Sequence, residues 1–305
     1  MVWRSAGISW QGGVPRLRWA GGGGRVSALP YGRELGFRAV GGVRRCSGAR
    51  GNPCPLTAVV PGRSTGGRCA ECARLDRAHS VAADTIADDP RPYRVYLAWF
   101  GPGMVKVGIT AEQRGSARLL EQGAVAFGWL GRGPLMGARR TEEVLRHALA
   151  VPDRIPYARK RAVRYALPPA EERAREITEL YEKAAGVPAW AETLEVLPCE
   201  VHDHAEAFAL DGLQGSPPGR VVTELVDDGV VAGRLVAAAG PDLHLLGAGA
   251  GAEADVRPLV LDTRLLTGWE LVAAPAGHPV TVPTAEAPAP TAPTCEDTAA
   301  QASLF

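Results

Sequence analysis

The feature that most constrains the fold of this chain is residues 93–110, YRVYLAWFGPGMVKVGIT, in which two apolar runs flank the tripeptide GPG. Apolar runs on either side of a short loop containing glycine and proline are typical of a β-hairpin. A three-residue loop would place Lys106 opposite Ala98 in an antiparallel register. Two residues further along, the same register places Tyr96 opposite Gly108. The hairpin therefore carries a lysine in the middle of a strand that is otherwise hydrophobic.

Side chains along the two strands alternate between the faces of the hairpin. One face is apolar throughout and is expected to be buried; it consists of Val95, Leu97, Trp99, Val105, Val107 and Ile109. The other face carries Tyr96 and Lys106, which are diagonal neighbours about 7–8 Å apart in ordinary sheet geometry. With only small residues beside them, we expect a shallow, partly exposed surface that can accept a phosphate. Taken alone, a lysine on a hairpin is more often just a solvated charge.

Two helical segments are expected after the hairpin, near residues 114–122 and 137–150. The first carries Arg118. In the second, Glu143 and His147 are four residues apart and therefore share one face of the helix. A carboxylate can bind Mg²⁺ or Mn²⁺, an arginine can stabilise a pentavalent phosphate, and a tyrosine hydroxyl can position or deprotonate water. These residue types together indicate a metal-dependent phosphodiesterase site for DNA or RNA.

The same residues resemble the motifs of the GIY-YIG nuclease superfamily. RVYL is similar to the first motif and places Tyr96 at its tyrosine, and KVGIT is similar to the second motif with Lys106 at the leading position. Arg118 in ARLLEQ resembles the arginine of the first helix. Glu143 in EEVLRH resembles the metal-binding glutamate, and His147 matches an E-x-x-x-H variant. The resemblance implies a small nuclease core in which these five residues form the catalytic site.

A second resemblance spans about residues 25–275, whereas the nuclease likeness spans about 93–150. The chain is similar to an uncharacterised bacterial family, the domain of unknown function numbered 2797. The similarity lies in the cysteines ahead of VYLA, KVGIT and EQGA and in a later glycine-rich strand section, GRLVAAAGPDLHLLG. The chain departs from the nuclease pattern in one respect. Its only asparagine is Asn52, so the superfamily's asparagine near the end of the core is absent. This departure favours a binding module that has lost the chemistry.

Four of the 6 cysteines lie between residues 46 and 72. Cys69 and Cys72 form a CxxC knuckle of the kind that binds metal, and Cys46 and Cys54 can supply two more thiolates for a tetrahedral zinc site. The gap between Cys46 and Cys54 is wider than in ordinary zinc ribbons, so His79 is a substitute ligand and free cysteines are the alternative. Such a site would be structural and would stabilise the loop without catalysing a reaction.

The remaining cysteines are less informative. Cys199, His202 and His204 have metal-ligating side chains at short spacing, but an ordinary strand-and-loop surface explains them better. Cys295 lies in a segment rich in proline, alanine and threonine, where we expect it to be inert.

Charge is distributed unevenly along the chain, although the net formal charge is only +1. Residues 1–80 contain 13 arginines and 3 acidic residues, whereas residues 200–305 contain 4 arginines and 15 acidic residues. A basic segment with Trp3, Trp10 and Trp19 fits a nucleic-acid partner, because arginine neutralises phosphate and aromatic rings stack on bases. A solvated surface, or pairing with the acidic C-terminal part, is the alternative interpretation.

No run of about 20 apolar residues could span a membrane, and the N-terminus lacks the apolar region of a signal peptide. We therefore expect a cytoplasmic protein without a membrane partner. Its hydrophobic content of 46% is that of a soluble globular protein with a sizeable core.

The expected elements predict an α+β protein with four consecutive parts. These are a basic β module with the zinc knuckle (1–91), a GIY-YIG-like core (92–168), a helix followed by a C-terminal β section (169–274) and a disordered tail (275–305). Three functions stay open at this point. They are a divalent-metal phosphodiesterase, a non-catalytic zinc-containing nucleic-acid-binding module, and a protein-interaction scaffold in which the zinc and the hairpin are architectural.

Overall fold

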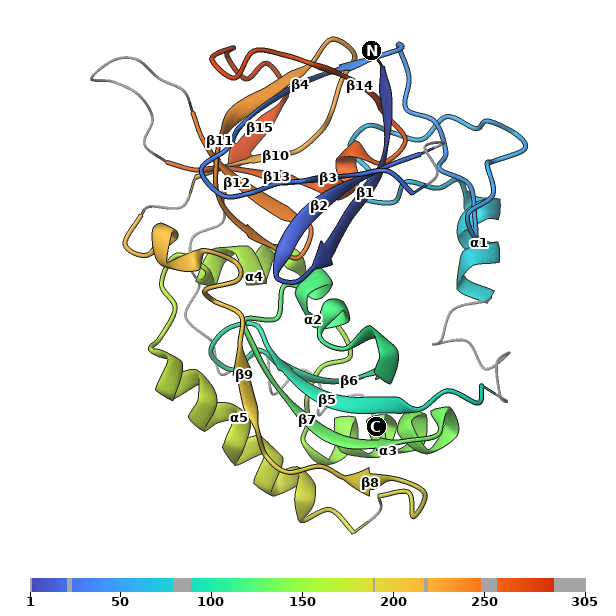
Figure 1. The fold of residues 1–305 in the computed structure, drawn as a ribbon, viewed down its shortest axis with the longest axis vertical. Coiled ribbons are helices and arrows are strands. Elements are labelled where there is room, and N and C mark those ends of the chain that lie inside the picture. The colour runs from blue at the N-terminus through green and yellow to red at the C-terminus, as the bar shows by residue number, and fades with distance from the viewer. Residues whose placement is uncertain are drawn as a thin grey trace, which may run out of the picture.

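The computed structural model describes residues 2–20, 24–78, 89–188, 190–216, 219–247 and 257–287 of the chain. Within these ranges the chain forms two β-sheets, and most of the helices lie around the smaller sheet (Figure 1). The mixed helix and strand content confirms the predicted α+β class. No helix in the described ranges is long and apolar enough to cross a membrane.

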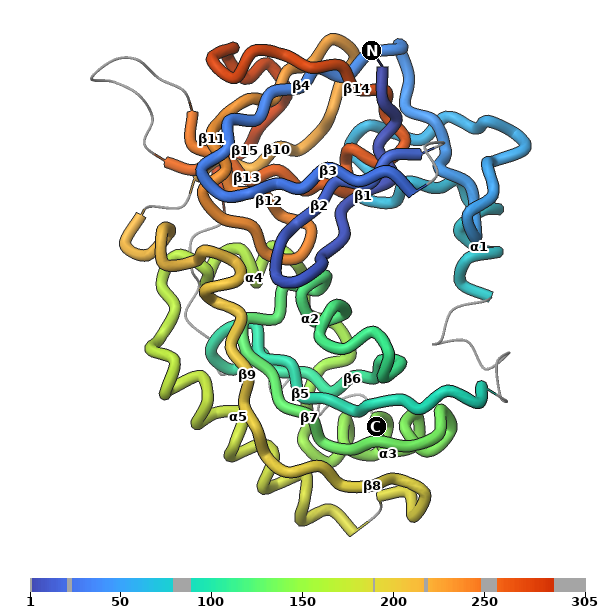
Figure 2. Tube along the Cα trace, viewed as in Figure 1, coloured from blue at the N-terminus to red at the C-terminus, as the bar shows by residue number. Residues whose placement is uncertain are grey.

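The larger sheet combines strands from both ends of the chain, in the order β15-β10-β13-β12-β11-β4-β14-β1-β2-β3. Its N-terminal strands are β1 (Trp3–Gln11), β2 (Val14–Trp19), β3 (Val26–Ala28) and β4 (Glu34–Val40). Its C-terminal strands are β10 (Arg220–Val222), β11 (Val230–Ala239), β12 (Asp242–Leu246), β13 (Leu259–Asp262), β14 (Glu270–Ala273) and β15 (Thr284–Glu286). Figure 2 shows the N-terminal strands in blue beside the C-terminal strands in orange.

The two β sections that the sequence predicts as separate parts are therefore one sheet. β4 lies between β11 and β14, and β14 also pairs with β1. All of these pairs are antiparallel, whereas β10 and β13 are parallel. Local sequence patterns predict individual strands, but the pairing of strands from opposite ends of the chain leaves no local signal.

The segment expected to be a disordered tail begins with ordered structure. β15 pairs with β10, and just before it Val282 is buried while the amide of Thr281 donates to the carbonyl of Val230. A short apolar stretch around Val282 is enough to anchor the chain within a proline-rich composition. Residues 288–305, including Cys295, lie outside the described residues.

The smaller sheet is built on the predicted hairpin. Its strands are β5 (Tyr93–Trp99), β6 (Val105–Ala111), β7 (Ala126–Gly133), β8 (Glu195–Val196) and β9 (Val201–Asp203), in the order β6-β5-β7-β8 with β9 also paired to β7. The predicted register is confirmed, because Tyr96 pairs with Gly108 and Ala98 pairs with Lys106. The sequence analysis missed the central strand β7, which is buried on both faces and therefore lacks the alternation that marks a half-exposed strand.

The helices are α1 (Ala70–Ala78), α2 (Ala117–Gln122), α3 (Leu135–Ala148), α4 (Tyr157–Val163) and α5 (Ala170–Ala185), with short 3-10 helices η1 (Glu112–Arg114), η2 (Leu210–Leu213) and η3 (Thr263–Leu266). The two predicted helices after the hairpin correspond to α2 and α3. In the sequence PPAEERAREITELYEKAAG, Pro169 favours the start of a helix and Gly186 its end, and α5 lies between them. It packs against the smaller sheet rather than belonging to the C-terminal strands, because Ile177 and Ala184 of its apolar stripe are fully buried there.

Both faces of the hairpin are covered. The predicted apolar face is buried in the main core, with Ile109 only partly so, and it contacts α3 and α5. The opposite face, predicted to be shallow and open, is packed by a second apolar cluster; its buried members are Tyr96, Ala98, Phe100, Met104, Leu119, Ala124, Phe127, Trp129 and Ile155. This expectation was wrong because β7 brings two aromatic side chains to that face and α2 adds Leu119.

Candidate functional site

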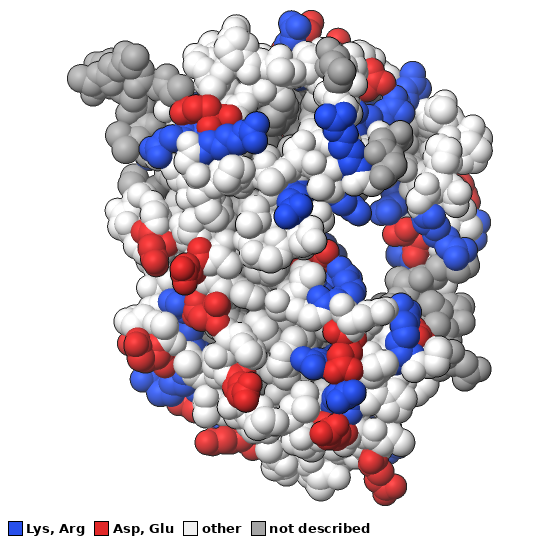
Figure 3. All heavy atoms as spheres, viewed as in Figure 1, with Lys and Arg blue, Asp and Glu red and all other residues white. Residues whose placement is uncertain are grey.

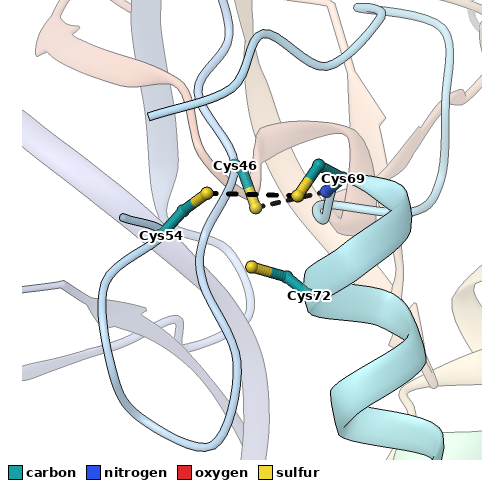
Figure 4. Close-up of side chains that lie close together, drawn as sticks. All are labelled: Cys46, Cys54, Cys69 and Cys72. Carbon is teal, nitrogen blue, oxygen red and sulfur yellow. Dashed lines mark hydrogen bonds between the residues drawn. The ribbon is translucent and has the colours of Figure 1, made fainter. Parts of the chain in front are cut away.

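Four cysteines converge beside the larger sheet (Figure 4). Cys46 and Cys54 lie in the loop after β4, Cys69 directly precedes α1, and Cys72 lies in the first turn of α1. Their Sγ atoms all lie within 4.8 Å of one another. The predicted clustering of these thiols is confirmed. The substitute ligand, His79, lies outside the described residues.

Backbone amides point toward the sulfur atoms of this cluster. The amides of Gly48 and Cys69 donate to Cys46 Sγ over 3.4 and 3.2 Å. Gly48 has a φ of 79°, and a Cβ there would lie 1.9 Å from a backbone oxygen four residues later, so only glycine fits this turn. Hydrogen bonding by the backbone of Ala58 lowers the pKa of Cys54 to about 7. The lowered pKa of Cys54 favours its thiolate, which is the form that binds a metal, whereas burial raises the pKa of Cys72 to about 12.

The cluster has the geometry of a tetrahedral metal site. Zn–S bonds of about 2.3 Å would hold four thiolate sulfurs about 3.8 Å apart. The Sγ atoms of Cys54 and Cys69 are 4.0 Å apart. The wide gap between Cys46 and Cys54 is taken up by a separate tight turn, in which Ala49 and Asn52 form a β-bridge. A metal with four thiolate ligands has no open position for a substrate, so this site is suited to a structural role.

Arg44 attaches the cysteine loop to the larger sheet. Its side chain is 1% exposed. The guanidinium donates to the carbonyl oxygens of Pro61 and Ser64 in the cysteine loop, and to those of Arg264 and Thr267 in and after η3. Burial lowers the pKa of Arg44 to about 10, so the group stays charged at neutral pH. The loop is therefore held by a charged anchor as well as by its cysteines.

Tyr96 and Lys106 lie on one face of the hairpin, as predicted. The tyrosine ring lies across Gly108, where a Cβ would be 2.4 Å from the phenol oxygen, so the glycine makes room for it. Tyr96 is 1% exposed, and Trp129 packs edge-on against it with ring centroids 6.2 Å apart. Lys106 is partly buried. The expectation of partial exposure is thus confirmed for Lys106 and wrong for Tyr96.

Two side chains of α2 act on the hydroxyl of Tyr96. Gln122 Nε2 donates to it over 2.9 Å, and the charge of Arg118, four residues earlier on the same helix face, lowers its pKa. Burial raises the pKa of Tyr96, while Gln122 and Arg118 oppose the rise. Because Gln122 donates, the phenol oxygen acts as an acceptor toward it, and the hydroxyl proton is available to another partner. Tyr96 is therefore suited to donate a hydrogen bond rather than to act as a base.

Glu143 and His147 do not join this group. Both are exposed on α3, where Glu143 Oε1 lies 2.7 Å from Arg146 Nη2 and 2.8 Å from His147 Nε2. The helix phase explains their position. Thr141 and Leu145 are fully buried, and each is two residues from Glu143, which places the glutamate about 200° around the helix from both. The predicted pairing of Glu143 with His147 is therefore confirmed, but the pair faces solvent.

The preceding residue, Glu142, is the carboxylate of α3 whose charge acts on Tyr96 and Lys106. It is four residues after Ala138 and three before Leu145, both fully buried, so it lies toward the sheet side of α3. Burial raises the pKa of Glu142 to about 7; the charge of Lys106 opposes this rise and that of Asp153 adds to it. Two adjacent glutamates make the motif ambiguous, but the helical spacing to buried residues indicates that Glu142, and not Glu143, lies on the sheet side of α3.

Lys160 is a further cation near this group, which the sequence analysis missed together with α4. Its Nζ lies 3.6 Å from the ring centroid of Phe100 and 4.6 Å from that of Tyr157, and it donates to the carbonyl of Gln122 over 3.1 Å. Lys160 is buried, and burial lowers its pKa to about 7. Because Gln122 in turn holds the tyrosine hydroxyl, Lys160 fixes the position of that hydroxyl indirectly.

A buried charge network joins α4 and the residue after it to the larger sheet. Arg161 Nη2 lies 2.7 Å from Asp242 and 2.7 Å from Asp262, and Arg164 Nη1 lies 2.6 Å from Asp242. Arg264 lies 2.6 Å from Asp262. Burial alone raises the pKa of Asp242, but Arg164 and Arg161 outweigh it and hold that pKa below the usual range for a carboxyl. The network fixes the helices around the smaller sheet to the larger sheet.

Cys199, His202 and His204 do not form a second metal centre. Within the described part of the chain, only the four clustered cysteines make a group of three or more metal-ligating side chains. The two histidine rings instead flank Phe127, with ring centroids 4.8 and 5.0 Å from it. Cys199 Sγ lies 3.9 Å from Thr178 Oγ1. A strand-and-loop surface, the alternative interpretation, therefore accounts for these residues.

Residues 32–271 match the model of one protein family, described as a protein of unknown function (DUF2797). The match includes the four clustered cysteines, the hairpin, α2, α3 and most of the larger sheet. No curated protein and no solved structure matches the chain. Because the matched range covers well over half of the 305 residues, the chain belongs to the DUF2797 family.

Proposed function

We propose that this protein binds nucleic acid and that Tyr96, Lys106, Arg118 and Glu142 form a divalent-metal phosphodiesterase site. The observation that supports the proposal is that Tyr96 and Lys106 share one face of the hairpin and that the charges of Arg118 on α2 and Glu142 on α3 both act on the pKa values of these two side chains. Perturbed ionisable groups gathered in one place are characteristic of functional sites. Their order along the chain also fits the resemblance to the GIY-YIG nucleases, with Glu142 in place of Glu143.

Each side chain has one role in this proposal. A divalent cation held by Glu142 would supply positive charge at the phosphate and would acidify a bound water. Asp153, which interacts with both Glu142 and Lys106, offers a second carboxylate for such a cation. Lys106 and Arg118 neutralise the phosphate oxygens as negative charge develops on them. Tyr96 donates its proton in a hydrogen bond to the phosphate or to the attacking water.

We infer that the cysteine cluster holds one structural zinc ion. The inference rests on the convergence of the four Sγ atoms within 4.8 Å and on the amides that donate to Cys46. Thiolate ligands select zinc over harder cations such as Mg²⁺. The metal would order the loop that Arg44 attaches to the larger sheet and would take no part in the reaction.

A binding module without catalysis is the second candidate function. Tyr96 is only 1% exposed, and the asparagine of the superfamily pattern is missing. Both observations are compatible with a phosphate-binding surface that no longer cleaves.

The test uses the purified full-length chain with single- and double-stranded DNA and RNA, with and without Mg²⁺ or Mn²⁺. Glu142→Gln is compared with Glu143→Gln, a matched change one residue away on the solvent side of the same helix. We expect cation-dependent cleavage that falls by roughly 100-fold or more in Glu142→Gln. Cleavage by Glu143→Gln should equal that of the unmodified protein.

The other outcomes separate the candidates. Binding without cleavage under every condition would support the non-catalytic module. Equal loss of activity in both variants, or loss only in Glu143→Gln, would overturn the assignment of Glu142. Absence of both binding and cleavage at low ionic strength would leave the protein-interaction scaffold.

A further inference from the structure

The N-terminal strands form a surface with unbalanced positive charge. The first 33 residues of the chain contain arginines at five positions and no acidic residue; the arginines are Arg4, Arg16, Arg18, Arg25 and Arg33. Arg4 pairs with Glu270. Arg16, Arg18 and Arg25 have no ion-pair partner among the residues that the structure describes, and the Nε atom of Arg16 also has no hydrogen-bond partner there. Arg18 Nη2 does donate to the carbonyl of Ala6 over 3.1 Å, but among the described residues no carboxylate balances the charge of these three guanidinium groups.

The structure divides the three tryptophans of this segment into two kinds. Trp10 belongs to the core, where its Nε1 donates to the carbonyl of Gly240 over 3.0 Å. Trp3 and Trp19 are only partly buried, and their ring centroids lie 5.8 Å apart with a 50° angle between the rings. The guanidinium carbon of Arg25 lies 4.2 Å from the centroid of Trp3. Trp3, Trp19 and Arg25 therefore lie together on the surface of the larger sheet.

β1 runs from this surface toward the candidate phosphodiesterase site. Trp3 begins the strand, whereas Trp10 near its other end donates to Gly240, which lies against Gly123 at the end of α2. α2, which carries Arg118, contacts β1 of the larger sheet. Figure 3 shows basic side chains over the N-terminal strands and along the rim of the opening between the two sheets.

We propose that Trp3, Trp19, Arg16, Arg18 and Arg25 form a docking surface for single-stranded nucleic acid. Bases of a single strand can leave their own stack and lie on exposed aromatic rings, whereas bases in a duplex are already stacked. The unpaired arginines fit the phosphates of the same strand by charge. The surface is built from β-strands and offers no helix to enter a major groove. The proposal deepens the proposed function by naming the substrate class, and it rests on that function only for cleavage.

The test measures fluorescence anisotropy of a fluorescein-labelled oligothymidylate of about 20 nucleotides, a length that covers one or two typical single-strand sites. Trp3→Ala should weaken binding by roughly tenfold or more, because loss of one base stack has an effect of that size. Trp3→Tyr, which keeps an aromatic face, should restore most of the affinity. In the double variant Arg18→Gln/Arg25→Gln, the slope of log affinity against log salt should decrease by about 1.4, or about 0.7 for each lost phosphate contact.

Two controls keep the result specific. Arg175→Gln removes an exposed arginine from α5, away from this surface, and should leave both affinity and salt slope unchanged. Thermal unfolding of every variant shows whether the fold is intact. Hydrolysis of bis(p-nitrophenyl) phosphate, which is too small to reach the docking surface, reports on the phosphodiesterase site alone.

These measurements distinguish failure of the inference from failure of the proposed function. Oligonucleotide binding that depends on Trp3, in a protein that hydrolyses no phosphodiester, would support the docking surface and reject the enzyme. Hydrolysis of the small phosphodiester with oligonucleotide affinity unaffected in the tryptophan and arginine variants would reject the docking surface. Tighter binding to a duplex, or equal Trp3-dependent binding to polyglutamate, would also overturn the assignment to single-stranded nucleic acid.

Discussion

The cysteine cluster and the Tyr96 group each bring four reactive side chains together, but they do so in opposite ways. The cysteines are identical, come from one short stretch of chain, and receive hydrogen bonds from the local backbone. The Tyr96 group combines a phenol, two cations and a carboxylate from three elements, and burial shifts the pKa values of Tyr96, Lys106 and Glu142 toward their neutral forms. The first arrangement is complete once a metal is bound. In the second arrangement the charges of the side chains do not cancel, so it is better suited to an exchangeable ligand.

The largest effect is expected from removing one cysteine. Cys72→Ser should reduce the zinc content from about one ion per chain to near zero, because a serine hydroxyl is a poor replacement for a thiolate in a tetrahedral site. The loop would lose metal-binding free energy, which is about 10–16 kcal/mol in zinc-finger peptides. Metal analysis by mass spectrometry and limited proteolysis within residues 44–78 measure the two consequences.

Cys199→Ser is the control for this change, since Cys199 is exposed and outside the cluster. It should retain the metal and resist proteolysis. A protein that contains no zinc when purified with reductant and without chelators would contradict the structural metal site. The cysteine cluster would then no longer differ from the Tyr96 group in holding a permanent metal.

The next largest effect concerns the cations of the Tyr96 group. Lys106→Met and Arg118→Met should each reduce cation-dependent cleavage by roughly 100- to 1000-fold, the usual result of removing one group that stabilises charge in a transition state. Thermal stability should change little, because neither side chain is part of the apolar core. A lowered unfolding temperature together with unchanged specific activity in either variant would mean that the group is structural, like the cysteine cluster.

A smaller effect is expected in the pH dependence of stability. Burial raises the pKa of Glu142 to about 7, above its ordinary value of 4.5. The folded state therefore holds a proton that the unfolded state loses between these pH values, and stability decreases as pH rises through this window. Glu142→Gln should remove the decrease and raise the free energy of unfolding at pH 8 by about 1–2 kcal/mol.

Urea unfolding at several pH values between 5.5 and 8, without added divalent cations, measures this effect. Glu143→Gln should retain the decrease, because Arg146 and His147 lower the pKa of Glu143. Added Mn²⁺ should reduce the difference between the unmodified protein and Glu142→Gln if the carboxylate binds the cation. A flat profile for the unmodified protein would contradict the burial of a titrating Glu142.

The smallest effect is expected for Gln122→Met. This change removes the amide that donates to Tyr96 and should cost about 1 kcal/mol of stability, the usual net value of one hydrogen bond. Gln113→Met, at an exposed position in η1, is the matched control and should have no measurable effect. Equal unfolding free energies for the two variants would mean that the tyrosine hydroxyl does not depend on α2.

Much of the candidate site could be predicted from short-range spacing. The hairpin register followed from the loop length and placed Tyr96 beside Gly108 and near Lys106. The clustering of the four cysteines followed from their proximity in sequence. The choice between Glu142 and Glu143 did not follow from the motif, because it depends on which side of α3 faces the sheet.

The sequence by itself determined the elements whose signals are local: the hairpin and its register, the limits of α5 at Pro169 and Gly186, and the cysteine knuckle. Turn chemistry, helix capping and alternation act over a few residues, so they can be recognised along the chain. Only the tertiary structure decided that the two ends of the chain form one sheet, that β7 buries Tyr96, and that Lys160 lies beside this group. These features depend on contacts between residues distant in sequence, and the free energy of packing that selects them is a property of the whole fold.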